Sequence, residues 1–130
     1  MSTAPTGGTE ATAGAAAAPS ASDRDGNLTA AQRNALRSAK SYLAMSGFSR
    51  QGLIDQLSSE YGEKFSVADA TAAVDNLNVD WKAQAARSAA AYLEMSGFSC
   101  RGLIDQLSSP SGEQFTVEQA TYGAGRAGIC

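Results

Sequence analysis

The sequence SGFSRQGLIDQLSSEYGEKFS at residues 46–66 returns almost unchanged as SGFSCRGLIDQLSSPSGEQFT at residues 96–116. Around these two stretches, residues 33–80 align without gaps onto residues 83–130 at an offset of 50, and 25 of the 48 aligned pairs are identical. Identity at a fixed offset is the signature of an internal repeat. The ordered part of the chain is therefore predicted to be two copies of one small unit.

Each unit has the pattern of three short helices. Apolar residues recur at helical spacing in each segment, and Thr29 with Gln32 forms a capping-box pattern at the start of the first helix. Gly47 and Gly97 are expected to end the first helix of each unit in a left-handed conformation, and the last helix is expected to dissolve among the glycines near the C-terminus. The predicted fold class is all-α, with two tandem three-helix, helix-turn-helix-like repeats.

The chain divides into three predicted segments. Residues 1–27 consist mostly of Ala, Ser, Thr, Gly and Pro, and such a segment cannot bury enough apolar surface to offset the entropy lost on ordering. We expect residues 1–27 to be a disordered tether, residues 28–79 to form the first repeat, and residues 80–130 to form the second. The tether has neither the basic start nor the apolar core of a signal peptide.

The composition excludes several classes of enzyme. The chain has no His, so it cannot build a Ser/His/Asp triad or use an imidazole base, and two Cys are too few for a structural zinc site. No glycine-rich phosphate-binding motif occurs. Lys plus Arg is 10 against 13 for Asp plus Glu, the opposite of the balance that binding to nucleic acid favours. We expect a protein without catalytic residues, cofactor, metal or nucleic-acid partner.

The two cysteines align with a pair of opposite charges. Cys100 corresponds to Arg50 and Cys130 corresponds to Asp80 in the repeat alignment. If the repeats share a fold, these positions touch in both, and the second repeat closes them with a disulfide where the first uses an Arg50–Asp80 ion pair. The alternative is two unrelated free thiols, with Asp80 as a helix N-cap. A disulfide would place the chain in an oxidising compartment.

Charge is unevenly distributed in the first repeat. Basic residues gather before residue 51, and an acidic stretch follows with Asp55, Glu60, Glu63, Asp69 and Asp75 as a candidate partner-binding face. These carboxylates would attract a basic protein partner; the alternative is an ordinary solvated surface. In the third helix, where a helix-turn-helix protein reads DNA, Asp69 and Asp75 would repel phosphates.

Large side chains at repeated or junction positions are expected to pack. Trp81 lies where the repeats meet, and it either packs one unit against the other or belongs to the core of the second unit. Met45 and Met95 recur at the same position and are expected to fill the core.

The chain resembles the Ltp family of host-cell-surface-exposed lipoproteins over about 100 residues, nearly everything outside the predicted tether. The resemblance lies in the segments SAKSYLAMSGFSRQGLIDQLSSEYGEKFSVADATAAVDNLNVDW and SAAAYLEMSGFSCRGLIDQLSSPSGEQFTVEQATYG. The pattern is carried by Tyr42, Leu43, Phe48, Ser49, Gly52, Leu53, Gln56, Leu57, Gly62, Glu63, Phe65 and Ala70, and again by Tyr92, Leu93, Phe98, Ser99, Gly102, Leu103, Gln106, Leu107, Gly112, Glu113, Phe115 and Ala120.

The resemblance implies a non-enzymatic protein displayed outside Gram-positive cells on a lipid anchor. Phage-encoded members of the family act in superinfection exclusion, blocking DNA injection by binding a phage injection protein. The only cysteines here are Cys100 and Cys130, so the chain carries no lipobox cysteine: either the anchor belongs to a longer form, or this is a shorter, unanchored form. We expect an extracytoplasmic monomer. The alternatives are an envelope spacer module and an intracellular DNA-binding regulator.

Overall fold

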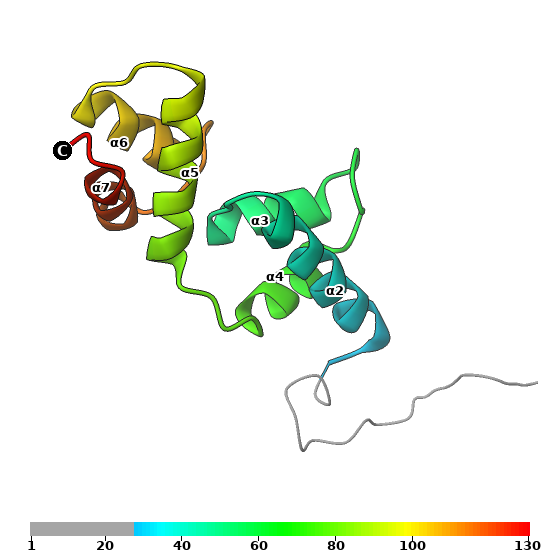
Figure 1. The fold of residues 1–130 in the computed structure, drawn as a ribbon. Helices are drawn as coiled ribbons and strands as arrows, with labels where there is room; N and C mark the ends of the chain where they lie inside the picture. Colours follow the sequence, from blue (N-terminus) through cyan, green and yellow to red (C-terminus); the bar gives the residue numbers. More distant parts are fainter. Residues whose placement is uncertain (1–27) are drawn as a thin grey trace, which may run out of the picture.

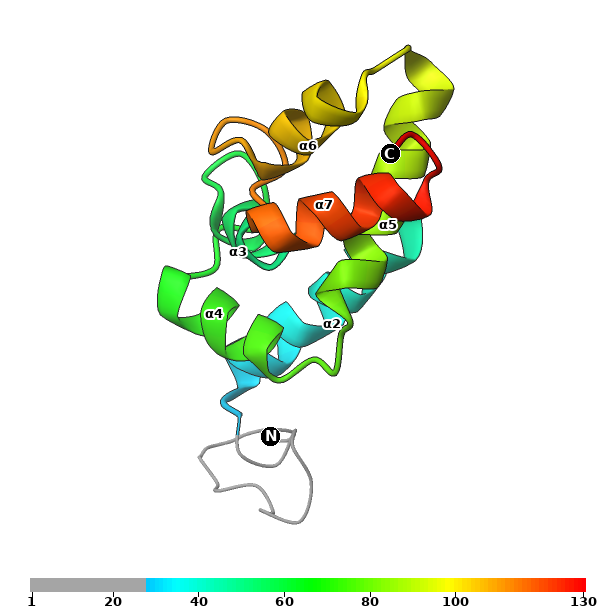
Figure 2. The same ribbon diagram turned by 90° about the vertical axis from the view of Figure 1, so that its left-hand side faces the viewer.

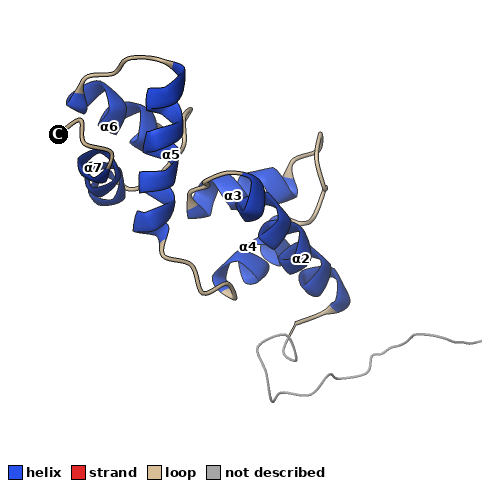
Figure 3. Cartoon of the chain, in the orientation of Figure 1, coloured by secondary structure: helices blue, strands red, loops and turns tan. Residues whose placement is uncertain are grey.

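The computed structural model describes residues 28–130 (Figure 1). All regular secondary structure in this part of the chain is helical, which confirms the all-α prediction (Figure 3). The predicted tether, residues 1–27, lies outside the described residues. The helices are α2 (Ala30–Met45), α3 (Arg50–Ser58), α4 (Val67–Asp75), α5 (Trp81–Met95), α6 (Cys100–Ser108) and α7 (Val117–Arg126).

Short polar side chains fix where the helices begin. The Thr29 side chain accepts from the Gln32 amide while the Gln32 side chain accepts from the Thr29 amide, so the predicted capping box is present at α2. Ser49 and Ser99 accept from the amides of Gly52 and Gly102 and cap α3 and α6 in the same way. Each cap satisfies an amide that the first helical turn leaves without a partner.

The helices form two three-helix repeats, α2–α4 and α5–α7, which lie beside each other (Figures 1 and 2). Each repeat has its own core of buried Leu, Ala and Val or Phe side chains. The first core centres on Ala39, Leu53, Ile54, Leu57, Ala70 and Val74. The second centres on Ala85, Ala89, Leu103, Leu107, Phe115, Ala120 and Ala124. Leu53 and Leu103 occupy the same place in the two units, so one sequence pattern builds both cores.

The turn between the second and third helix of each repeat has one unusual residue. Lys64 and Gln114 have φ values of 60° and 64°, in the left-handed region that side-chain-bearing residues rarely adopt. The next amide, of Phe65 or Phe115, donates to the carbonyl of Leu57 or Leu107, which folds the turn back onto its helix. The repeats thus share the turn as well as the helices.

Gly47 does not end α2 in the expected left-handed conformation. The helix ends at Met45, and Ser46 leaves it in an extended conformation with φ −159°; α5 ends in the same way at Ser96. The Ser46 amide still donates to the Tyr42 carbonyl, so no left-handed residue is needed to satisfy it. The expectation was wrong because the chain enters the extended N-cap of α3 only three residues later.

The last helix also differs from the sequence expectation. α7 continues through Gly123 and Gly125 to Arg126, and of these C-terminal glycines only Gly128, with φ 89°, adopts a left-handed conformation. A Cβ on Gly123 would lie 2.7 Å from the backbone of Ala85, so this glycine lets α7 approach α5 closely. Tertiary packing therefore keeps the helix intact where local propensity disfavours it.

Candidate partner-binding surface

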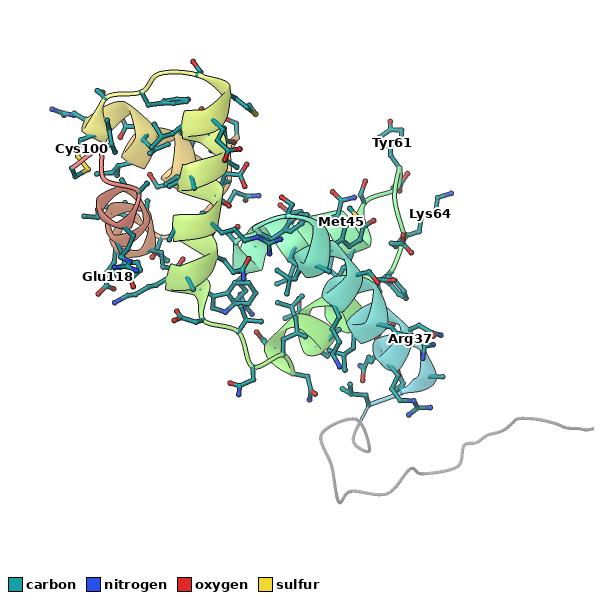
Figure 4. All side chains as sticks on the ribbon, viewed as in Figure 1. Arg37, Met45, Tyr61, Lys64, Cys100 and Glu118 are labelled. Carbon is teal, nitrogen blue, oxygen red and sulfur yellow. A yellow bond between two sulfur atoms is a disulfide. The ribbon has the colours of Figure 1, made fainter. Side chains whose placement is uncertain are left out.

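A disulfide closes the second repeat. Cys100, the first residue of α6, is bonded to Cys130, with an S–S distance of 2.12 Å and a Cα–Cα distance of 5.1 Å across 30 residues (Figure 4). This is the pairing that the repeat alignment indicated. It ties the segment after α7 to the start of α6.

At the corresponding place in the first repeat, Arg50 forms an ion pair, but with a different acidic residue from the one predicted. Arg50 donates from Nε to Asp75 Oδ1 at 2.7 Å and from Nη2 to Asp75 Oδ2 at 2.9 Å. Asp80 instead caps α5, accepting from the amides of Lys82 and Ala83. The predicted Arg50–Asp80 pair is corrected, because Asp80 is taken by the helix cap while Asp75 ends α4 beside Arg50. In the second repeat, Gly125 stands where Asp75 stands in the first.

The Arg50–Asp75 pair is solvent-exposed, with side chains 44% and 52% accessible, so its contribution to stability is small. The hydrogen bonds from Arg50 lower the pKa of the Asp75 carboxyl below its ordinary value of 3.8. A carboxyl whose pKa is lowered by folding stabilises the protein above its unfolded-state pKa and loses that contribution as the pH falls.

We expect Asp75→Asn to lower the free energy of unfolding by up to about 1 kcal/mol at pH 7. The difference from the native protein should shrink as the pH falls below 3.8 and disappear once Asp75 is protonated in the folded as well as the unfolded state. Urea denaturation at several pH values measures this. The matched control is Glu60→Gln, because within residues 28–130 no interaction of the Glu60 side chain is seen; an equal loss in the control would contradict the assignment.

The candidate acidic residues do not form one free face. Asp69 Oδ1 accepts from Gln32 on α2, whereas Asp75 binds Arg50 on α3. Six residues apart on a helix, these two side chains point about 120° away from each other. Asp55 accepts from Gln51 and from Gln114 of the second repeat. Sequence reasoning missed this division because a charge count does not record direction.

Glu63 and its counterpart Glu113 belong to a repeated side-chain network. Tyr42 donates to Glu63 Oε2 at 3.3 Å and accepts from Gln56, and Tyr92 donates to Glu113 Oε2 at 2.6 Å and accepts from Gln106. Burial, together with the neighbouring Glu113, raises the pKa of Tyr92. Each tyrosine also packs edge-on against Phe48 or Phe98. The network holds the turn against the first helix and accounts for Tyr, Gln and Glu at these repeated positions.

The repeats meet at a junction built largely from backbone atoms. The Arg87 guanidinium on α5 donates to the carbonyls of Leu43 and Ala44 at the end of α2. Ser49 Oγ donates to the carbonyl of Glu113, and Gly47 lies against α5 at Ser88. These contacts connect the repeats beyond the covalent link.

Trp81 also belongs to this region. It is the first residue of α5, in the second repeat, but its half-buried ring packs against the core of the first repeat. Trp81 therefore bridges the two units.

A small open cavity lies beside the junction. Its volume is about 210 Å³, and it is lined by Ser46, Gly47, Ser88, Ala91, Tyr92, Met95 and Glu113. Among the described residues, no group of three or more Cys, Asp or Glu could hold a metal ion, and no helix is long and apolar enough to cross a membrane.

Several large apolar side chains are exposed. Met45 and Met95 are 74% and 76% accessible, so the expectation that they fill the core was wrong: each is the last residue of its helix and points away from the packed interface. Tyr61 is fully exposed in the turn between α3 and α4, which projects from the repeat with Lys64 (Figure 4). The sequence could have pointed to Tyr61 as an exposed residue, because its counterpart in the second repeat is a different residue, Ser111.

The charges on α4 do not suit binding to DNA. In a helix-turn-helix protein the helix at this position enters the major groove. The charged residues of α4 are Asp69 and Asp75, and the helix has no basic residue to contact a phosphate.

Comparison with known proteins supplies a family. The family model of the host cell surface-exposed lipoproteins matches residues 30–77 and, a second time, residues 80–124. Among solved structures, the chain is similar to Ltp, a superinfection exclusion protein from the Streptococcus thermophilus temperate phage TP-J34, with 31% sequence identity and a TM-score of 0.68. That match covers 75% of this chain and 96% of the other. A comparison with curated proteins finds no match.

Proposed function

Because the chain belongs to the family of host cell surface-exposed lipoproteins, we propose that it is a non-enzymatic binding module that protects a cell against incoming phage. The observation that carries the proposal is the similarity to a superinfection exclusion protein, at 31% identity over 75% of this chain. The family match supports it as well, because it covers both repeats, residues 30–77 and 80–124.

The proposed mechanism is capture of a phage injection protein outside the cytoplasm, so that DNA entry fails although the phage still adsorbs. Two features of the chain support this. The Cys100–Cys130 disulfide suits an oxidising, extracytoplasmic setting. Met45, Tyr61 and Met95 are exposed, and Met and Tyr are side-chain types that are enriched at protein–protein interfaces.

The test is to display residues 1–130 on the surface of a phage-sensitive Gram-positive host through a heterologous anchor. We expect plating efficiency to fall at least tenfold, adsorption to stay unchanged, and intracellular phage DNA early after infection to fall with plating. The control is the same chain retained in the cytoplasm. Unchanged DNA entry for every phage tested, together with altered envelope integrity, would instead favour a spacer role.

The acidic residues of the first repeat are proposed to attract a basic segment of that partner. Glu60 is the best placed of them, because it is exposed on the projecting turn next to Tyr61, and within residues 28–130 no interaction of its side chain is seen.

We expect Glu60→Lys to weaken exclusion, raising plating efficiency at least fivefold over the native displayed chain, because a reversed charge slows association with a basic partner. Plaque counts on cells with matched display levels measure this. The control is Glu118→Lys, a charge reversal in the second repeat, where the carboxylate lies 3.9 Å from Lys82. Equal effects of both variants would contradict a role for the first repeat's acidic residues.

A further inference from the structure

Each contact of the junction between the repeats uses a residue that has a counterpart in the other repeat. On the first repeat, Gly47, Ser49 and Asp55 meet the second; their counterparts are Gly97, Ser99 and Asp105. On the second repeat, Arg87, Ser88 and Gln114 meet the first; their counterparts are Arg37, Ser38 and Lys64. The chain therefore carries most of each half of the junction twice and uses each half once. The exceptions are Gln84, which accepts from the Phe48 amide, and Trp81; their counterparts are Asn34 and Ala31.

The unused half on the second repeat, here called the tail face, comprises Gly97, Ser99 and Asp105. A Cβ added to Gly47 would lie 2.7 Å from Ser88 Oγ, whereas one added to Gly97 would meet no described atom within 4 Å. Ser49 is buried, with 1% of its surface accessible, but Ser99 is exposed. The same backbone shape is thus covered in the first repeat and left open in the second.

The unused half on the first repeat, here called the head face, comprises Arg37, Ser38 and Lys64. Ser88 is buried at 5% accessibility, while its counterpart Ser38 is only half-buried. Arg37 is exposed and donates to Asn34 on its own helix, where Arg87 reaches the other repeat. Lys64 has nearly the same φ as Gln114, so the turn presents its side chain in the same way.

We propose that the head face of one copy of this chain docks on the tail face of a second copy, repeating the internal junction between molecules. Arg37 would then donate to the carbonyls of Leu93 and Glu94, as Arg87 donates to those of Leu43 and Ala44. Because this contact joins two different surfaces, it does not close into a symmetric pair and can add further copies. The sequence alone led us to expect a monomer.

Two sequence differences between the repeats favour a second copy as the occupant. The internal junction has a hydrogen bond from Gln114 to Asp55; between copies, Lys64 would face Asp105 and form an ion pair. Ala44 at the internal junction is replaced by Glu94 in the second repeat, next to the position that Arg37 would occupy. Opposite charges across both positions fix the register of the contact.

The contact between copies is weaker than the internal one. Ala31 stands in the first repeat where Trp81 stands in the second, so the bridging ring is missing. The internal junction also gains from the covalent link, which is equivalent to an effective concentration of roughly millimolar. Association is therefore expected only at high protein concentration, or where copies are concentrated on a surface.

The experiment is sedimentation velocity of the oxidised full chain from 0.01 to 1 mM, with one variant blocked at each face. Arg37→Glu blocks the head face and Gly97→Leu blocks the tail face, where the described structure has space for the side chain. We expect the native chain to form dimers and larger species, and each variant alone to associate at least fivefold more weakly. A mixture of the two variants should recover association and stop at the dimer, because one intact head and one intact tail remain.

The matched control is Lys40→Glu, a charge reversal on the same helix as Arg37 at a position with no counterpart contact in the junction, which should associate like the native chain. Circular dichroism confirms that each variant keeps its helices. A native chain that stays monomeric at 1 mM overturns the proposal. The proposal is also overturned if each blocked variant still forms a dimer by itself. Such a dimer would be held by a symmetric contact that does not join a head face to a tail face.

Discussion

Replacing Cys100 and Cys130 together by Ser will lower the free energy of unfolding by about 3–4 kcal/mol, the largest loss that we expect from any change discussed for this chain. The disulfide closes a segment of 30 residues, and closing a loop of that length removes this much chain entropy from the unfolded state. Urea denaturation of the oxidised native chain and of the double variant, followed by circular dichroism, measures the difference.

The control for the disulfide is the Arg50–Asp75 ion pair, which occupies the equivalent place in the first repeat. Arg50→Ala removes the ion pair at the position equivalent to Cys100 and should cost at most about 1 kcal/mol, because the pair is exposed. A reducing agent should destabilise the native chain and leave the Cys→Ser variant unchanged. A loss below about 1 kcal/mol on removing the disulfide would mean that packing alone holds the last segment in place.

Most of what could be predicted about the fold came from local sequence patterns and from the internal repeat. Helical spacing of apolar residues gave the three helices of each unit, the capping-box pattern gave the start of the first helix at Thr29, and aligning the units gave the pairing of Cys100 with Cys130. These features depend on local patterns or on equivalence between repeats, and both are visible in one dimension. The helix-turn-helix outline followed for the same reason.

Features that depend on the direction in which a side chain points in the folded chain could not be predicted in this way. Asp75 and Asp80 are both carboxylates near the end of α4, and only the folded backbone decides which one meets Arg50. Met45 carries an apolar side chain at helical spacing but ends its helix, so it faces solvent. Gly47 reads as a helix stop, although its role is to lie against α5.

Gly123→Ala will destabilise the protein by about 1–3 kcal/mol, even though alanine is the better helix former. The new Cβ would lie 2.7 Å from both the carbonyl carbon and the carbonyl oxygen of Ala85, and 3.0 Å from its Cβ. Backbone atoms cannot rotate out of the way as a flexible side chain can, so α7 must move away from α5. Urea denaturation followed by circular dichroism measures the loss.

The neighbouring glycine is the control. Gly125 lies on the same helix with no described atom within 4 Å of an added Cβ, so Gly125→Ala should stabilise the protein by up to about 1 kcal/mol through helix propensity alone. The first repeat holds Ala73 where the second has Gly123, so a three-helix unit of this kind accommodates a methyl group when its helices are spaced for it. The disulfide restrains such a shift by fixing the segment that follows α7. Gly123→Ala should therefore cost less in the Cys→Ser background, and a stabilising Gly123→Ala in the oxidised chain would show that α7 moves freely.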